Sequence, residues 1–111
     1  MIEVSFRTDP EGLIREFKVS GHAGYDEPGK DIVCAAVSAV VQTAVIGLTD
    51  VAGIRIKPVQ RKGLAECRLP ENLEEEQRKS ADIILKTMMA GLQSIKLGYP
   101  SRISIRERKV D

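Results

Sequence analysis

The chain has 111 residues, of which 42% are hydrophobic and 30% are charged, with a formal net charge of +1. This length fits one domain, which we expect to span residues 1–111, and this composition excludes a disordered or fibrous chain. The near-neutral charge and the absence of Trp disfavour a nucleic-acid-binding module, because such modules attract phosphates with positive charge and stack bases on aromatic rings.

The first predicted elements form a β-hairpin. Residues 1–7 alternate hydrophobic with charged or polar side chains, residues 9–12 have the turn-forming sequence Asp-Pro-Glu-Gly, and residues 13–19 alternate again. The first residues lack the basic segment and apolar run of a secretory signal. We therefore expect a cytoplasmic protein.

A long, glycine-rich loop is predicted after the hairpin. Residues 20–30 show no periodicity and contain Gly21, Gly24, Pro28 and Gly29. Glycine and proline at this density interrupt regular structure and predict a flexible connection. Long loops of this kind often carry function.

A hydrophobic helix is predicted from Asp31, which we expect to be the N-cap, to about residue 51, before Gly53. Its apolar residues lie on nearly every face, which is typical of a central helix buried on all sides. The weakly polar stretch 32–48 is shorter than the roughly 20 residues that a bilayer core requires. We therefore expect a core helix and no membrane association.

The second half of the chain repeats the order of strands and helix. Residues 54–57 alternate Ile-Arg-Ile-Lys and predict a strand, which Pro58 places near a sheet edge. Residues 61–63 predict a turn, and residues 64–69 predict the returning strand.

The last two elements are a helix and a strand. Asn72 and Glu75 suggest a capping box that begins an amphipathic helix ending near Gly98, and the alternation around Ile103 and Ile105 predicts a final strand. The order is ββαββαβ. We therefore predict an α+β fold in two layers, with two helices packed on one face of a mostly antiparallel sheet.

The candidate nucleophile is Cys34, in the first turn of the helix that Asp31 caps. Unpaired backbone N–H groups and the helix dipole favour an anion there, which a thiolate supplies. His22, the only histidine, lies twelve residues earlier in the loop. An imidazole able to fold over Cys34 makes the pair a candidate catalytic dyad. The alternative is a small core cysteine and a surface histidine, and the spacing alone leaves both open.

Two further residues each have two interpretations. Asp31 either caps the helix or also orients His22 and stabilises its imidazolium. Ser38, one turn after Cys34, hydrogen-bonds the sulfur, a substrate or the carbonyl four residues back. Cys67 alternates in phase with buried positions, and we expect it to be an unreactive core residue.

Metal and redox chemistry are weaker hypotheses. Two cysteines and one histidine are too few for a structural zinc site, so we predict no metal. A redox role for Cys34 requires Cys67 as the resolving partner, and the strand phase points Cys67 inward.

Two segments resemble the signature of the ribosomal-processing cysteine protease family called Prp. These are residues 20–24, Ser-Gly-His-Ala-Gly, and residues 28–38, Pro-Gly-Lys-Asp-Ile-Val-Cys-Ala-Ala-Val-Ser. The family shares the length and the ββαββαβ order, so the resemblance covers the whole chain. It implies a cysteine endopeptidase that removes the N-terminal extension of a large-subunit ribosomal protein, number twenty-seven. It also implies that His22 and Cys34 form the dyad, with Asp31 and Ser38 beside it.

The implied mechanism needs neither metal nor organic cofactor. Backbone N–H groups at the helix start are expected to stabilise the oxyanion, and Gly21, Gly24 and Gly29 let the loop close over an extended ribosomal-protein peptide. A sheet with an uncovered face also suggests a homodimer.

A hypothesis of another class is a non-catalytic ribosome-assembly or RNA-associated protein. Such a protein would bind RNA with the arginines that we place on strands, which are Arg55, Arg102, Arg106 and Arg108. The alternatives are that these arginines face solvent or a partner subunit.

Overall fold

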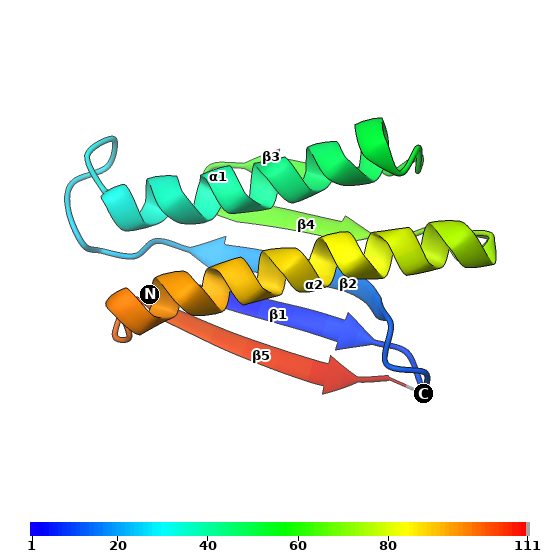
Figure 1. The fold of residues 1–111 in the computed structure, drawn as a ribbon. Coiled ribbons are helices and arrows are strands. Elements are labelled where there is room, and N and C mark those ends of the chain that lie inside the picture. Colours follow the sequence, from blue (N-terminus) through cyan, green and yellow to red (C-terminus); the bar gives the residue numbers. More distant parts are fainter. Residues whose placement is uncertain (111) are drawn as a thin grey trace.

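The computed structural model describes residues 1–110 and confirms the predicted α+β fold. In chain order the elements are β1 (Ile2–Thr8), β2 (Ile14–Gly21), α1 (Ile32–Ile46), a short π-helical extension η1 (Gly47–Val51), β3 (Val59–Arg61), β4 (Leu64–Arg68), α2 (Glu75–Gly98) and β5 (Ile103–Lys109). The two helices run in opposite directions across one face of the sheet and leave the other face uncovered (Figure 1).

The sheet has the strand order β3-β4-β2-β1-β5. Neighbouring strands are antiparallel except β1 and β5, which are parallel. In the β1–β2 pair Ile2 lies opposite Gly21. Gly21 has a φ of +90°, and a Cβ there would collide with the Met1 carbonyl oxygen. Glycine is therefore required at the point where β2 leaves the sheet and the long loop begins.

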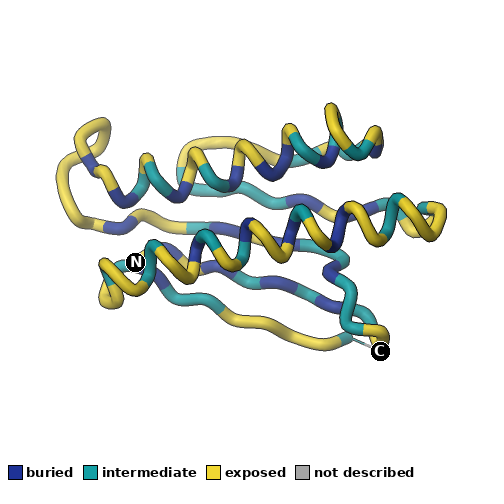
Figure 2. Tube along the Cα trace, viewed as in Figure 1, coloured by how far each residue is buried: buried dark blue, intermediate teal, exposed yellow. Residues whose placement is uncertain are grey.

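The hydrophobic core lies between the sheet and the helices. Strand residues alternate between this layer and the open face, so Ile2, Val4 and Phe6 are buried while their neighbours are not. The buried side chains follow one side of each helix (Figure 2). They are Val33, Val37, Val41, Ala44 and Val45 in α1 and Ala81, Asp82, Leu85, Met88 and Leu92 in α2.

The expectation that the first helix is buried on nearly every face is wrong. Its outer side faces solvent, and Ile32 and Ile46 are each 55% exposed. The reason is the layer arrangement, in which one layer of helices covers one sheet face and no further element covers the helices. Residues 32–51 are long and apolar enough to span a membrane, with a mean hydropathy of 2.1, but the core helix of a soluble protein meets the same criterion.

Two predicted boundaries are also corrected. Residues 54–57 are not a strand, because the N–H of the buried Ile54 donates to the Leu48 carbonyl of η1 at 2.9 Å instead of to a neighbouring strand. The edge strand begins at Val59, after Pro58. The second helix has Glu74 as its N-cap instead of Asn72, without a side-chain cap hydrogen bond. Glu75 and Glu76 in its first turn stabilise the helix, because negative charge is favourable at the positive end of the helix dipole.

Candidate active site

Asp31 ties the loop to the start of α1 and is the N-cap that the sequence predicts. Its Oδ1 accepts hydrogen bonds from the N–H groups of Val33 and Cys34, both at 3.0 Å. Its Oδ2 accepts from the N–H groups of Tyr25 at 2.9 Å and Asp26 at 3.2 Å. Desolvation raises the pKa of Asp31, but the four N–H donors together outweigh it and hold the pKa below its ordinary value.

Cys34 is half-buried in the first turn of α1, where its thiol meets the loop. Its Sγ accepts a hydrogen bond from the Ala23 N–H at 3.3 Å. Ala23 is itself buried, so the residue after His22 is anchored directly beside the thiol. A thiolate accepts such a hydrogen bond more strongly than a thiol does, because the acceptor is charged. The surroundings of Cys34 therefore suit a nucleophile.

His22 is exposed and lies directly after β2, against the turn between β3 and β4. A Cβ at Gly63 would lie 3.0 Å from the His22 Nε2, and the Gly21 N–H donates to the Gly63 carbonyl at 3.0 Å. The turn therefore supports the imidazole from one side. In the part of the chain that the structure describes, no hydrogen bond joins His22 to Cys34 or to Asp31.

The backbone N–H groups at the start of α1 are the oxyanion donors that the sequence predicts. The Val33 and Cys34 N–H groups at the helix start are bonded to Asp31 Oδ1. The Ala23 N–H is the group that donates to the Cys34 thiol. Ser38 is exposed one turn along α1, and the loop glycines Gly24 and Gly29 are also exposed.

Two residues outside the predicted site contact this loop. The sequence predicts a strand position for Arg102, yet this residue precedes β5 and its guanidinium donates to the Gly24 carbonyl at 2.8 Å. For Gly63 the sequence predicts only a turn. Neither contact follows a local pattern, since Arg102 and Gly24 are 78 residues apart.

Cys67 is a core residue, as predicted. It is buried in β4, and burial raises its pKa to about 11. Such a thiol is inert at neutral pH, because almost none of it is thiolate. Within residues 1–110, no three His, Cys, Asp or Glu side chains are grouped to hold a metal ion.

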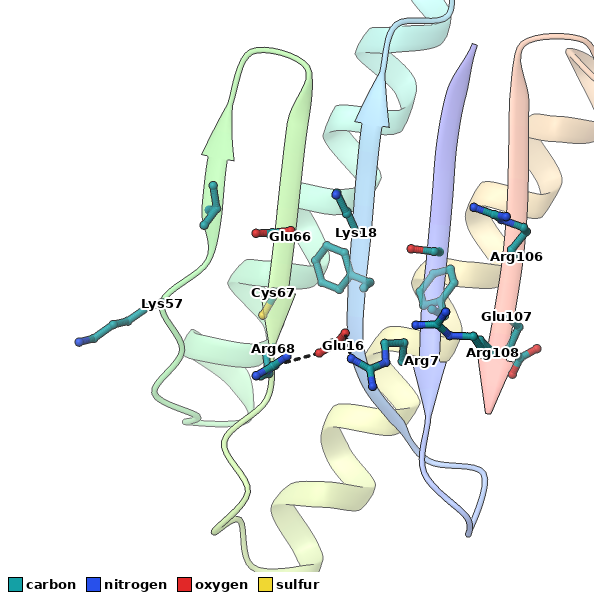
Figure 3. A pocket seen from close by; sticks show the side chains of 14 residues that line it. Arg7, Glu16, Lys18, Lys57, Glu66, Cys67, Arg68, Arg106, Glu107 and Arg108 are labelled. Carbon is teal, nitrogen blue, oxygen red and sulfur yellow. Dashed lines mark hydrogen bonds and ion pairs between the residues drawn. The ribbon is translucent and has the colours of Figure 1, made fainter. Parts of the chain in front are cut away.

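The open face of the sheet carries a separate cavity of about 600 Å³, which His22 and Cys34 do not line. Arg7 and Arg68 flank Glu16 there, at 2.7 Å and 2.9 Å (Figure 3). Two of the predicted strand arginines, Arg106 and Arg108, also line this cavity from β5. The other two, Arg55 and Arg102, lie outside the strands.

Comparison with known proteins places this arrangement in a family. The family model described as "Cysteine protease Prp" matches residues 1–104. The ribosomal processing cysteine protease Prp of Bacillus subtilis is 31% identical over 107 residues, which cover 95% of this chain and 96% of that protein.

Solved structures with the same fold include proteases of the same name. The crystal structure of Prp from S. aureus with a covalently linked product peptide has a TM-score of 0.86 and 29% identity, and the match covers 97% of this chain and 100% of that one. The structure of the S. aureus protease with a substrate peptide has a TM-score of 0.81 and 28% identity, with the same coverage. The family model and these relatives agree with the fold and with the position of Cys34 at the capped start of α1. The chain therefore belongs to the Prp family of cysteine proteases.

Proposed function

We propose that the protein is a cytoplasmic cysteine endopeptidase that removes the N-terminal extension of a large-subunit ribosomal protein, number twenty-seven. The observation that carries the proposal is the placement of Cys34 at the capped start of α1, with the backbone beside His22 hydrogen-bonded to its thiol. The relatives named above are ribosomal processing proteases, and the solved structures of Prp from S. aureus hold a covalently linked product peptide or a substrate peptide. The whole chain serves as one protease domain, residues 1–111.

The reaction follows from the two side chains. His22 takes the proton of the Cys34 thiol, and the thiolate attacks the scissile carbonyl carbon to form a C–S bond. The C–N bond then breaks as the imidazolium gives its proton to the leaving amine. The neutral imidazole then takes a proton from water, which attacks the thioester carbon. The C–S bond breaks, the acid product leaves, and the imidazolium returns the proton to the Cys34 sulfur. Atoms and charge balance without a cofactor.

The loop has to move during this cycle. In the structure the imidazole rests against Gly63 and has no hydrogen bond to Cys34 among the described residues. Catalytic hydrogen bonds often form only when substrate binds, so a closing step that brings His22 over the thiol completes the dyad. Asp31 keeps the helix start in place during this movement, because it is bonded to both segments.

The test is cleavage of a peptide that copies the extended N-terminus of the cognate ribosomal protein, with products read by mass spectrometry. We expect wild type to cut the peptide and Cys34→Ala or His22→Ala to lose at least about 1000-fold in rate, as when one member of a catalytic pair is removed. Cys67→Ala is the matched control, because it removes the other thiol and should retain the activity of the folded enzyme.

Circular dichroism of each variant separates loss of chemistry from loss of fold. Cleavage by Cys34→Ala at the wild-type rate would show that another residue is the nucleophile. Intact peptide with every variant, including wild type, would contradict the proposed substrate and favour the assembly or RNA-associated role. The homodimer stays a prediction.

A further inference from the structure

We propose that Arg102 is a positioning residue for the nucleophile: it holds the loop of residues 22–30 where the Ala23 N–H meets the Cys34 thiol. The proposal rests on the proposed function insofar as it takes Cys34 to be the nucleophile. It adds a residue from the far end of the chain to a site that is otherwise built from residues 21–38 and the turn at Gly63.

The backbone of Arg102 is fixed by regular elements on both sides. Its N–H donates to the Tyr99 carbonyl at 3.0 Å, at the end of α2, and its carbonyl accepts from the Ile2 N–H at 2.9 Å, at the start of β1. The end of α2, the start of β1 and the loop lie at the same end of the molecule (Figure 1). The side chain of Arg102 therefore reaches the loop from a rigid base.

The guanidinium contacts three consecutive loop residues. Its Nη1 donates to the Gly24 carbonyl at 2.8 Å and, more weakly, to the Ala23 carbonyl at 3.5 Å. Its carbon lies 5.7 Å from the centre of the Tyr25 ring, within the range of a cation–π interaction. The Tyr25 ring in turn meets Tyr99 edge to face, with centres 5.3 Å apart.

The loop has few other attachments. Residues 24–30 are all exposed. Within residues 35–110, Arg102 is the only residue whose side chain hydrogen-bonds to residues 22–30. Asp31 accepts from the N–H groups of the next residues, Tyr25 and Asp26. The Asp31 carboxylate and the Arg102 guanidinium thus both hold the loop, and the carboxylate also caps α1.

The consequence for Cys34 follows through Ala23. Arg102 holds the carbonyl of Ala23 and that of the next residue, while the N–H of Ala23 points at Sγ. Without the guanidinium, the carbonyls of Ala23 and Gly24 lose this donor, and the direction of the Ala23 N–H is held less firmly. The thiolate then loses a donor that stabilises it more than it stabilises the thiol.

The experiment measures alkylation of Cys34 by iodoacetamide between pH 5 and about 10, with peptide mapping to confirm the site, in wild type and Arg102→Gln. Accessibility scales the rate equally at every pH, whereas loss of the donor changes the shape of the profile. We expect the profile of Arg102→Gln to move to higher pH, so that its rate at pH 7, relative to its own plateau, falls below the wild-type ratio. In peptide cleavage, kcat should fall more than KM rises.

Two variants complete the design. Arg102→Lys keeps the charge and one donor and should recover part of the shift, whereas Arg106→Gln removes an exposed arginine of β5 and should match wild type. If Arg102→Gln does not fold, Tyr25→Leu replaces it, since loss of the ring contact should move the profile in the same direction by less.

A folded Arg102→Gln protein with the wild-type alkylation profile would overturn the proposal, whatever its cleavage rate. If wild type leaves the peptide uncut, the proposed function fails, and the alkylation profiles still decide the role of Arg102.

Discussion

The two ends of the sheet are held to the helices in different ways. At the β1–β2 turn, Asp9 accepts from the Glu11 and Leu13 N–H groups and pairs with Arg78 of α2 at 2.6 Å. Nearby, the buried Asp82 of α2 accepts from the Ile14 N–H at 2.8 Å and pairs with Lys86. At the other end, the loop of residues 22–30 joins β2 to α1 and is held mainly by Asp31 and Arg102.

The difference separates stability from chemistry. The turn end uses charged side chains of a long helix to hold a short segment, so little there can move without breaking a buried contact. The loop end leaves a long segment exposed and attaches it by contacts that can be released singly. The same end contains Cys34 and His22. A protease that must admit an extended peptide needs movement at its site and rigidity away from it, and this chain places the two at opposite ends.

The largest expected contrast is between the two cysteines. Cys67, with a pKa of about 11, is thiolate in only about one molecule in ten thousand at pH 7, and its side chain is buried. We expect iodoacetamide to modify Cys34 at least ~100-fold faster than Cys67 in the folded protein. Peptide mapping after timed alkylation measures both rates, and unfolding in guanidinium should remove the contrast. Equal rates in the folded state would contradict the burial of Cys67.

The turn end should carry stability without activity. Asp82→Ala leaves the buried Ile14 N–H without its acceptor, and we expect the free energy of unfolding to fall by about 2–3 kcal/mol, measured by urea denaturation. Cleavage by the protein that remains folded should stay within about twofold of wild type, because within residues 1–110 the polar contacts of Asp82 are to Ile14 and Lys86, away from the loop end.

Lys86→Ala is the control for this result. Lys86 is half-exposed and pairs with Asp82 at 2.8 Å, and such a pair contributes less than about 1 kcal/mol. A larger loss for Lys86→Ala than for Asp82→Ala would mean that the ion pair, and not the Ile14 hydrogen bond, secures the turn.

A smaller effect is expected from acid at the loop end. The folded-state pKa of Asp31 lies below its ordinary value of 3.8, because N–H groups of the loop and helix stabilise the carboxylate. The unfolded chain therefore takes up the proton first as the pH falls, and the stabilising contribution, complete above the unfolded pKa, is lost as the pH falls through the folded pKa. Asp31→Asn should accordingly be less stable than wild type at pH 7.

This pH dependence is measured by urea denaturation of wild type and Asp31→Asn from pH 7 down to about 3. The difference in stability between them should shrink on acidification. Other carboxylates with lowered pKa values, Asp9 and Glu16, affect both proteins alike and cancel in that difference. A difference that stays constant over the whole range would exclude the carboxylate charge as the cause.

The element order and the site segments could be predicted because their signals are local. Alternation of two residues predicts strands, Asp31 before an apolar run predicts a cap, and Cys34 three positions later falls where a helix start favours a thiolate. The boundary errors arose where tertiary contacts overrode local pattern. Residues 54–57 alternate as a strand does, yet Ile54 is bonded to Leu48 and buried beneath the helix end.

The outer face of α1 shows the same limit. An apolar helix is expected to be buried on every side, but α1 is covered only toward the sheet and toward α2, because the chain has one layer of helices. Ile32 and Ile46 are therefore exposed despite their hydrophobicity.

The sequence by itself determined the α+β order, the cap at Asp31, the burial of Cys67 and the family to which the chain belongs, because each depends on neighbouring residues or on a short motif. Only the tertiary structure decided that Gly63 supports His22 and that Arg102 grips the loop. These contacts join residues that are 41 and 78 positions apart. They exist because the sheet order and the parallel pairing of β1 with β5 bring the β3–β4 turn, the loop and the residue before β5 to the same end of the molecule.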